Sequence, residues 1–270
     1  MLAPGFYNGT AGKLFLYSQT ANNTSALIIL PPFADEMNKC RHLFQQLMQQ
    51  LTPFGIDCFL PDHFGTGDSE GDLTDATIDI WRADLIHLLA TLAAAGYHSC
   101  HLLAVRFGCL QALDLLQQPE LPLPVQQLVL WQPQFDQTKF WQQFVRIKIA
   151  EAMAIGTKTS QSTIEQQLAS GQLIEIAGYP LTNDFVSSLK QFTASLPEQL
   201  KDVQLSWFET SPLDNMAIPV QKMLAQLNSF TPVHYKQLKA EPYWQTTELA
   251  SADELLHYTV QQLLKGIADE

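Results

Sequence analysis

The sequence predicts an α/β protein with a mainly parallel central sheet flanked by helices. Apolar runs such as Ala26–Leu30 and Val125–Trp131 are typical of strands that are buried on both faces of a parallel sheet. These runs alternate along the chain with amphipathic stretches of helical length, which is the pattern of βαβ units. A third observation, the sharp strand-to-helix turn described below, narrows the class to one fold.

The amino-terminal half contains a hairpin followed by strands and helices in turn. Short apolar runs around Asn8-Gly9 and Ala11-Gly12 predict the hairpin over residues 5–17, because such pairs favour tight turns. Pro31-Pro32 and Pro61-Asp62 each end a strand, since proline cannot donate to a strand ladder. We expect strands over residues 26–30, 56–60, 102–105 and 125–131, and helices over residues 35–51, 77–95 and 107–117.

The alternation breaks after the sixth expected strand. Residues 135–201 have helical patterns over 139–153 and 163–169, a glycine-bounded segment over 171–178, and a further helix. We expect this insertion to form a cap on a core made of residues 1–134 and 202–270. In the second part of the core we expect strands over residues 203–208 and 233–238, and helices over residues 216–227 and 252–267.

The segment His101–Cys109 has the layout of a nucleophile elbow, the turn that exposes the reactive serine of α/β-hydrolases. The elbow reads small-x-Ser-x-Gly, and its small positions are filled here by Ala104 and Gly108. Arg106 stands where the serine would be. The sequence therefore predicts the α/β-hydrolase fold without that fold's usual nucleophile.

The other catalytic positions of this fold can be located along the sequence. Glu209 and Asp214 follow the first strand after the insertion and are candidates for the acid, although Asp214 equally suits the cap of the next helix. After the last strand, where the fold places its histidine, the chain has Trp244 and Gln245 and no histidine. We therefore expect neither the serine nor the histidine of a catalytic triad.

Arg106 has two plausible uses. Its planar guanidinium suits a carboxylate or phosphate ligand, and it equally suits an internal ion pair with Glu36, Asp62 or Glu209. Candidate ligand-binding residues lie at the start of the helix over 35–51 and at the carboxyl ends of strands: Arg106, Glu36, Asn38, Lys39, Asp62, Trp131, Gln132, Trp244 and Gln245.

Three functions agree with these residues. The first is a protein that binds an anionic, acyl or glycosyl ligand in the former active-site pocket. The second is an ester or thioester hydrolase in which a carboxylate such as Asp62, Glu36 or Glu209 activates water and Arg106 stabilises the oxyanion. The third is a scaffold or regulatory partner that uses the cap as its contact surface. Whether the protein is an enzyme stays open at this point.

Composition excludes several other classes. A formal charge of −12 and a pI of about 4.9 argue against nucleic acid and anionic membranes as partners. The four cysteines form no CxxC pair, and we expect no metal site and no cofactor. The chain contains no apolar run long enough for a transmembrane segment and no basic, apolar leader over residues 1–17, so we expect a cytoplasmic protein.

Seven segments of the chain together carry a family resemblance: Pro31–Lys39, Pro61–Ser69, Asp75–Thr77, Trp81–Leu85, Arg106–Gly108, Leu130–Pro133 and Glu241–Thr246. With these segments the chain resembles one family, the exosortase A system-associated hydrolases of the second type. The resemblance runs over most of the chain and is weakest in the cap. It implies a bacterial cytoplasmic protein with the α/β-hydrolase fold, associated with exopolysaccharide production, with proteins that carry PEP-CTERM tails, and with exosortase or polysaccharide-biosynthesis partners.

Overall fold

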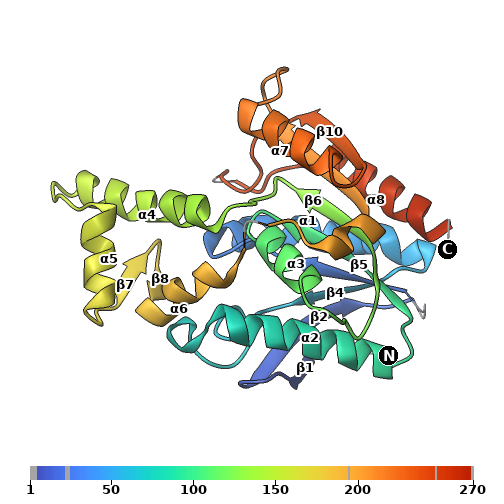
Figure 1. The fold of residues 1–270 in the computed structure, drawn as a ribbon, viewed down its shortest axis with the longest axis horizontal. Coiled ribbons are helices and arrows are strands. Elements are labelled where there is room, and N and C mark those ends of the chain that lie inside the picture. The colour runs from blue at the N-terminus through green and yellow to red at the C-terminus, as the bar shows by residue number, and fades with distance from the viewer. Residues whose placement is uncertain (1–4, 22–24, 194, 247, 269–270) are drawn as a thin grey trace.

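An eight-stranded sheet forms the centre of the computed structural model, which describes residues 5–21, 25–193, 195–246 and 248–268 (Figure 1). The strand order is β1-β2-β4-β3-β5-β6-β9-β10. The first two strands form an antiparallel hairpin, β2 is also antiparallel to its other neighbour β4, and the remaining neighbours are parallel. The strands are β1 (Gly5–Asn8), β2 (Lys13–Gln19), β3 (Ser25–Leu30), β4 (Asp57–Pro61), β5 (Ser99–Val105), β6 (Val125–Trp131), β9 (Gln204–Ser211) and β10 (Val233–Lys239).

Helices cover both faces of the sheet. Helices α1 (Asp35–Leu51) and α8 (Asp253–Ala268) pack on one face, where alternate residues of β3, β5 and β6 meet them. Helices α2 (Ile78–Ala94), α3 (Gly108–Leu116) and α7 (Ile218–Asn228) cover the other face. The central strands are buried on both sides, which explains their continuous apolar sequences.

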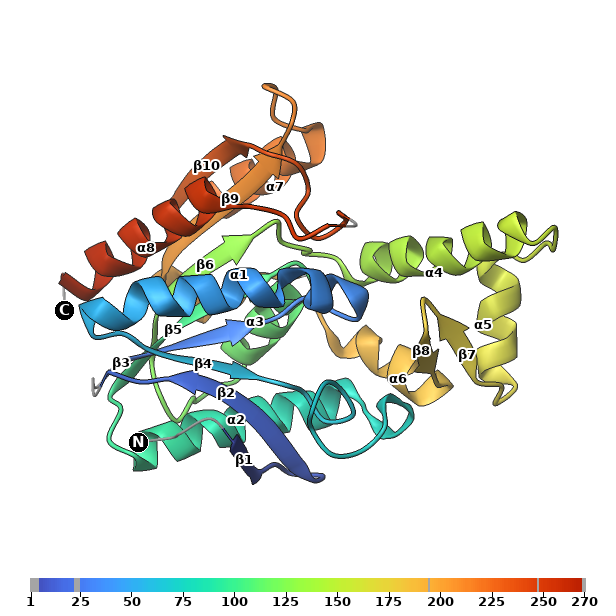
Figure 2. The same ribbon diagram turned by 180° about the vertical axis from the view of Figure 1, so that it is seen from behind.

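We call residues 135–201 the inserted segment, and its residues 135–188 lie beyond the carboxyl ends of the parallel strands (Figure 2). Apolar side chains of residues 140–192 pack with Phe33, Trp81 and Phe107 of the core in a third buried cluster. Leu196 and Leu200 pack instead in the core cluster that contains apolar side chains of α3. The segment contains α4 (Gln137–Ala154), α5 (Gln161–Ala169), β7 (Ile174–Ile176), β8 (Tyr179–Leu181), α6 (Asn183–Ser188) and the 3-10 turns Leu189–Gln191 and Glu198–Asp202.

The expected elements are present, with displaced boundaries. The helix expected over 216–227 begins at Ile218, and the strand expected over 203–208 continues to Ser211. The segment over 171–178 contains β7, which pairs with β8 just after it in an antiparallel hairpin. Both strands are too short to show an alternating pattern in the sequence. None of the helices in the described residues is long and apolar enough to cross a membrane.

Candidate functional site

The turn between β5 and α3 has the geometry of an elbow. Arg106 has a φ of 53°, in the left-handed region that side chains rarely adopt. Its backbone N–H donates to Trp131 of β6, and its carbonyl accepts from the N–H groups of Cys109 and Gln134, so the turn is held on both sides. A Cβ on Gly108 would lie 2.1 Å from the carbonyl oxygen of Leu30, so only glycine lets α3 pack this closely on β3.

The Arg106 guanidinium forms a two-pronged ion pair with Glu36 in the first turn of α1. Its Nε lies 3.1 Å from Glu36 Oε2, and its Nη2 lies 2.9 Å from Oε1. The guanidinium carbon lies 4.7 Å from the ring centroid of Trp244, within cation–π range. Of the three internal partners that the sequence allows, Glu36 makes the pair, and no hydrogen bond within the described residues involves Nη1.

Arg106 lines a cavity of about 610 Å³ between the core and the inserted segment. This volume is typical of sites that enclose a small organic molecule. We call this cavity the larger cavity. Five of the predicted residues line it: Glu36, Lys39, Arg106, Trp244 and Gln245. The others are Phe33, Asp35, Gln134, Phe140, Gln143, Phe144, Arg146, Ile147 and Ala177.

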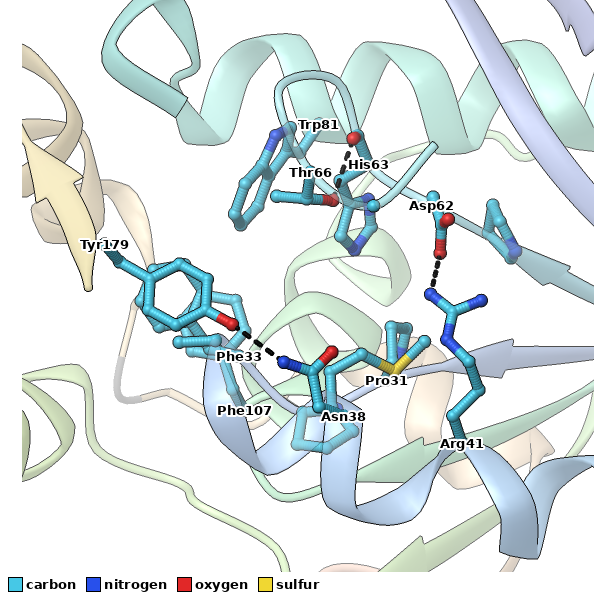
Figure 3. Close-up of a pocket in the computed structure, with 15 residues that line it drawn as sticks. Pro31, Phe33, Asn38, Arg41, Asp62, His63, Thr66, Trp81, Phe107 and Tyr179 are labelled. Atoms are coloured by element: carbon cyan, nitrogen blue, oxygen red, sulfur yellow. Dashed lines mark hydrogen bonds and ion pairs between the residues drawn. The ribbon is translucent and has the colours of Figure 1, made fainter. Parts of the chain in front are cut away.

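Phe33 also lines a second, smaller cavity of about 60 Å³ (Figure 3). Asp62 accepts from Arg41 at 2.7 Å and from the N–H of Asp68 at 3.0 Å, and a Cβ on Gly67 would collide with its carboxylate. Asn38 donates to the Tyr179 hydroxyl of β8 at 3.1 Å. This cavity has room for little more than water. Of its two predicted residues, Asn38 connects α1 to the inserted segment, and Asp62 connects the loop after β4 to α1.

Three solved structures show how this architecture compares with known proteins. The chain aligns with Est1E from Butyrivibrio proteoclasticus, solved with ferulic acid, at 13% identity and a TM-score of 0.65, over 98% of this chain and 99% of that one. A carboxylesterase from the thaumarchaeon Nitrososphaera gargenis aligns at 12% identity and a TM-score of 0.65, over 98% and 100%. Mouse alpha/beta hydrolase domain-containing protein 10 aligns at 14% identity and a TM-score of 0.58, over 99% of each chain.

The chain has the α/β-hydrolase fold. At these identities the likeness extends to the fold alone. No family model and no curated protein sequence matches the chain.

Glu209, the first of the two acid candidates from the sequence, has a buried carboxyl. Glu209 lies within β9, and its Oε1 accepts from the indole Nε1 of Trp207 at 2.7 Å. Burial raises the pKa of Glu209 from 4.5 to about 7, although the Trp207 hydrogen bond and the charge of Arg106 lower it. Glu209 lines neither cavity described above, so it is not placed to activate water there.

This raised pKa predicts a pH-dependent stability. The folded chain keeps the Glu209 proton more tightly than the unfolded chain does. The contribution of this proton to the free energy of unfolding is therefore present below about pH 4.5 and lost as the pH rises through about 7. Because Glu209→Gln cannot ionise, the free energy of unfolding of the wild type should fall relative to that of this variant by on the order of 1 to 3 kcal/mol over that range. Urea unfolding of both proteins at several pH values measures the difference. Parallel stability curves would contradict the prediction.

Asp214, the other acid candidate, does not reach the site. Its carboxylate is exposed and pairs with Lys239 at 3.1 Å, at the ends of β9 and β10. It does not cap α7 either, because that helix begins after Ala217 and has no side-chain cap. The interpretation of Asp214 as a helix cap is therefore wrong, because α7 starts later than the pattern suggests. As an acid candidate, Asp214 lines neither cavity described here.

Two predicted lining residues point elsewhere. Trp131 is buried on the α1–α8 face of the sheet, where its indole Nε1 donates to Thr259 of α8 at 2.8 Å. Gln132 has a φ of 48°, and its amide exchanges hydrogen bonds with the backbone N–H and carbonyl of Thr210. Both residues stabilise the end of β6, and neither lines a cavity described here. The alternation of side chains along β6 directs Trp131 onto the α1–α8 face, and the positive φ of Gln132 turns its side chain toward β9.

Several residues of the two cavities carry no signal in the sequence. His63 is buried in the smaller cavity, stacks on Trp81 at 4.6 Å and hydrogen-bonds Gln111, and burial lowers its pKa to about 4. Arg146 and Gln143 of α4 enter the larger cavity from the inserted segment, as Tyr179 enters the smaller one. Arg146, Gln143 and Tyr179 are identified only by the position of the inserted segment over the edge of the sheet.

Backbone strain gathers around the two cavities. Four residues other than glycine have a positive φ in the described chain: Ala34, Arg106, Gln132 and Ala177. The first three follow β3, β5 and β6 at the carboxyl edge of the sheet, and Ala177 joins β7 to β8 beside the larger cavity. Such outliers cluster at functional sites because surrounding contacts must hold them. The described residues contain no group of three His, Cys, Asp or Glu side chains that could hold a metal ion.

Proposed function

We propose that this protein binds an anionic ligand in the larger cavity and does not hydrolyse it. The observation that carries the proposal is the guanidinium of Arg106, which lies at the elbow in a cavity of ligand size. A guanidinium that is only 13% exposed attracts an anion more strongly than one at the open surface does. Arg106 offers planar donors there and no nucleophile.

The charge of the cavity lining supports an anionic ligand. Three cations, Lys39, Arg106 and Arg146, face two carboxylates, Asp35 and Glu36. The whole chain has the opposite balance, with 15 basic and 27 acidic residues. Arg146 has no ion pair among the described residues, so its charge is available to a ligand.

The carboxylates of the larger cavity give little support to a water-activating base. Asp35 pairs with Lys39 at 2.9 Å, and both oxygens of Glu36 accept from Arg106. Both carboxylates are thus already engaged with cations of the same cavity. The ester or thioester hydrolase in which Arg106 stabilises an oxyanion is therefore the second candidate.

The resemblance in sequence adds a cellular setting to the proposal. We propose that the protein acts in the cytoplasm of a bacterium with an exosortase system, in the production of exopolysaccharide. There the bound molecule would be an acyl or glycosyl compound. The inserted segment would serve as the cap of the cavity and as a contact surface for partner proteins of that system.

Two measurements test the proposed function. The purified protein should not turn over p-nitrophenyl acetate, p-nitrophenyl octanoate or the matching acyl thioesters above the background rate. Turnover that disappears in both Arg106→Gln and Glu36→Gln would establish the hydrolase instead.

Binding is measured by calorimetry with decanoate, octyl phosphate and glucuronate. We expect at least one of these anions to bind, and Arg106→Gln to weaken that binding about 30-fold or more, since a charge-assisted pair contributes about 2 kcal/mol. The control Lys222→Gln removes the same charge from the exposed face of α7, outside the cavity, and should bind as the wild type does. Equal binding by the Arg106 and Lys222 variants would contradict the proposal.

A further inference from the structure

We propose that the ligand of the larger cavity is an amphipathic carboxylate whose head group replaces Glu36 on Arg106. This inference rests on the proposed function and adds two statements to it. The first is the chemical class of the ligand. The second is that the Glu36 carboxylate occupies the position of the ligand's carboxylate when no ligand is bound. Glu36 would then set how tightly the ligand binds.

The position of Glu36 defines the seat for the head group. Its two carboxylate oxygens lie 3.1 and 2.9 Å from Nε and Nη2 of Arg106, in the two-pronged arrangement that suits a planar carboxylate. The ring of Trp244 lies against the same guanidinium at 4.7 Å and limits its movement. Another carboxylate in this position would make the same two hydrogen bonds.

Exchange is favourable because the two partners differ in burial. The side chain of Arg106 is 13% exposed, whereas that of Glu36 is 27% exposed. A nearly buried guanidinium needs an anion beside it, but a carboxylate in the first turn of a helix can turn outward into water. An incoming carboxylate therefore preserves the pairing of Arg106, and the displaced Glu36 regains its hydration.

The remainder of the lining matches an apolar body on the ligand. Phe33, Phe140, Phe144 and Ile147 line the same cavity. Near the head-group seat, the buried indole Nε1 of Trp244 has no hydrogen-bond partner among the described residues. A donor left unpaired in the protein favours a ligand that carries an acceptor.

The cations at the edge of the cavity favour the same ligand. Lys39 and Arg146 line the cavity together with Arg106, so a carboxylate that enters it meets three cationic side chains. Lys39 pairs with Asp35 and Arg106 pairs with Glu36, which leaves Arg146 as the one cation of the described lining without an ion pair. Attraction of this kind increases the local concentration of an anionic ligand.

Fluorescence titration with cis-parinaric acid tests the exchange, with its methyl ester as the neutral analogue. Glu36→Gln removes the competing charge and keeps the shape, so the acid should bind about tenfold more tightly than to the wild type. Asp35→Asn is the matched control. It removes one negative charge from the same helical turn and the same cavity, but Asp35 pairs with Lys39 and not with Arg106. The affinity of Asp35→Asn for the acid should therefore exceed that of the wild type by about threefold or less.

The outcomes separate this inference from the proposed function. Equal gains for Glu36→Gln and Asp35→Asn would overturn the exchange and leave anion binding in place. The same conclusion follows if octyl phosphate binds through Arg106 while parinaric acid does not. If neither the wild type nor Glu36→Gln binds any of the anions, the proposed function itself fails. Should Glu36→Gln not fold, the wild type decides, because it must prefer the acid over the methyl ester by about tenfold.

Discussion

Replacing Phe33 with alanine is expected to lower the free energy of unfolding by about 3–5 kcal/mol. The side chain of Phe33 is only 6% exposed. Its ring lies between 5.2 and 6.3 Å from six others, of which four belong to the inserted segment. Alanine would leave a hole where these rings meet, and the rigid aromatic neighbours cannot close it.

Chemical unfolding measures the loss, and Phe54→Ala is the control. Phe54 is the same residue type but is 58% exposed, so its removal should change stability by less than about 1 kcal/mol. Because Phe33 lines both cavities, its truncation should also join them into one. Similar losses for the two alanine variants would mean that the aromatic cluster does not hold the inserted segment on the core.

Gly108→Ala is expected to destabilise the protein by about 3 kcal/mol, although alanine is the better helix former. The added Cβ would lie 2.1 Å from the carbonyl oxygen and 2.7 Å from the carbonyl carbon of Leu30. These are backbone atoms of a central strand, so they cannot move aside as a flexible side chain can. The start of α3 must shift instead, and Arg106 would move with it.

Thermal and urea unfolding measure this effect, with Gly156→Ala as the control. Gly156 has a φ of 76° and open space around it, so alanine there meets backbone strain but no neighbouring atom. Gly156→Ala should lower the free energy of unfolding by about 1 kcal/mol. If Gly108→Ala lowers it by no more than Gly156→Ala does, the elbow does not depend on the close packing of α3 on β3.

The fold was predictable because its signals are local and repeated. Buried parallel strands have continuous apolar sequences, and Ala104 and Gly108 mark the elbow even without a serine between them. The boundaries of β9 and α7 were less accurate, because no capping residue marks the start of that helix. This small error misplaced Asp214.

The site was predictable only in part. Residues at the start of α1 and at Trp244 were found because the order of strands in the fold places them at one edge of the sheet. Trp131 and Gln132 follow the same rule, but the positive φ at Gln132 and the hydrogen bond from Trp131 to Thr259 direct them away. Arg146 and His63 were missed because tertiary packing alone brings them to the cavities.

The first two turns of α1 join three parts of the molecule that are distant along the chain. Glu36 meets the elbow 70 residues away, Asn38 meets β8 141 residues away, and Arg41 meets the loop after β4 21 residues away. Because one rigid helix carries all three side chains, energies measured for them are not additive. A double-mutant cycle between Glu36 and Asn38 would therefore measure how strongly α1 couples the elbow to the inserted segment.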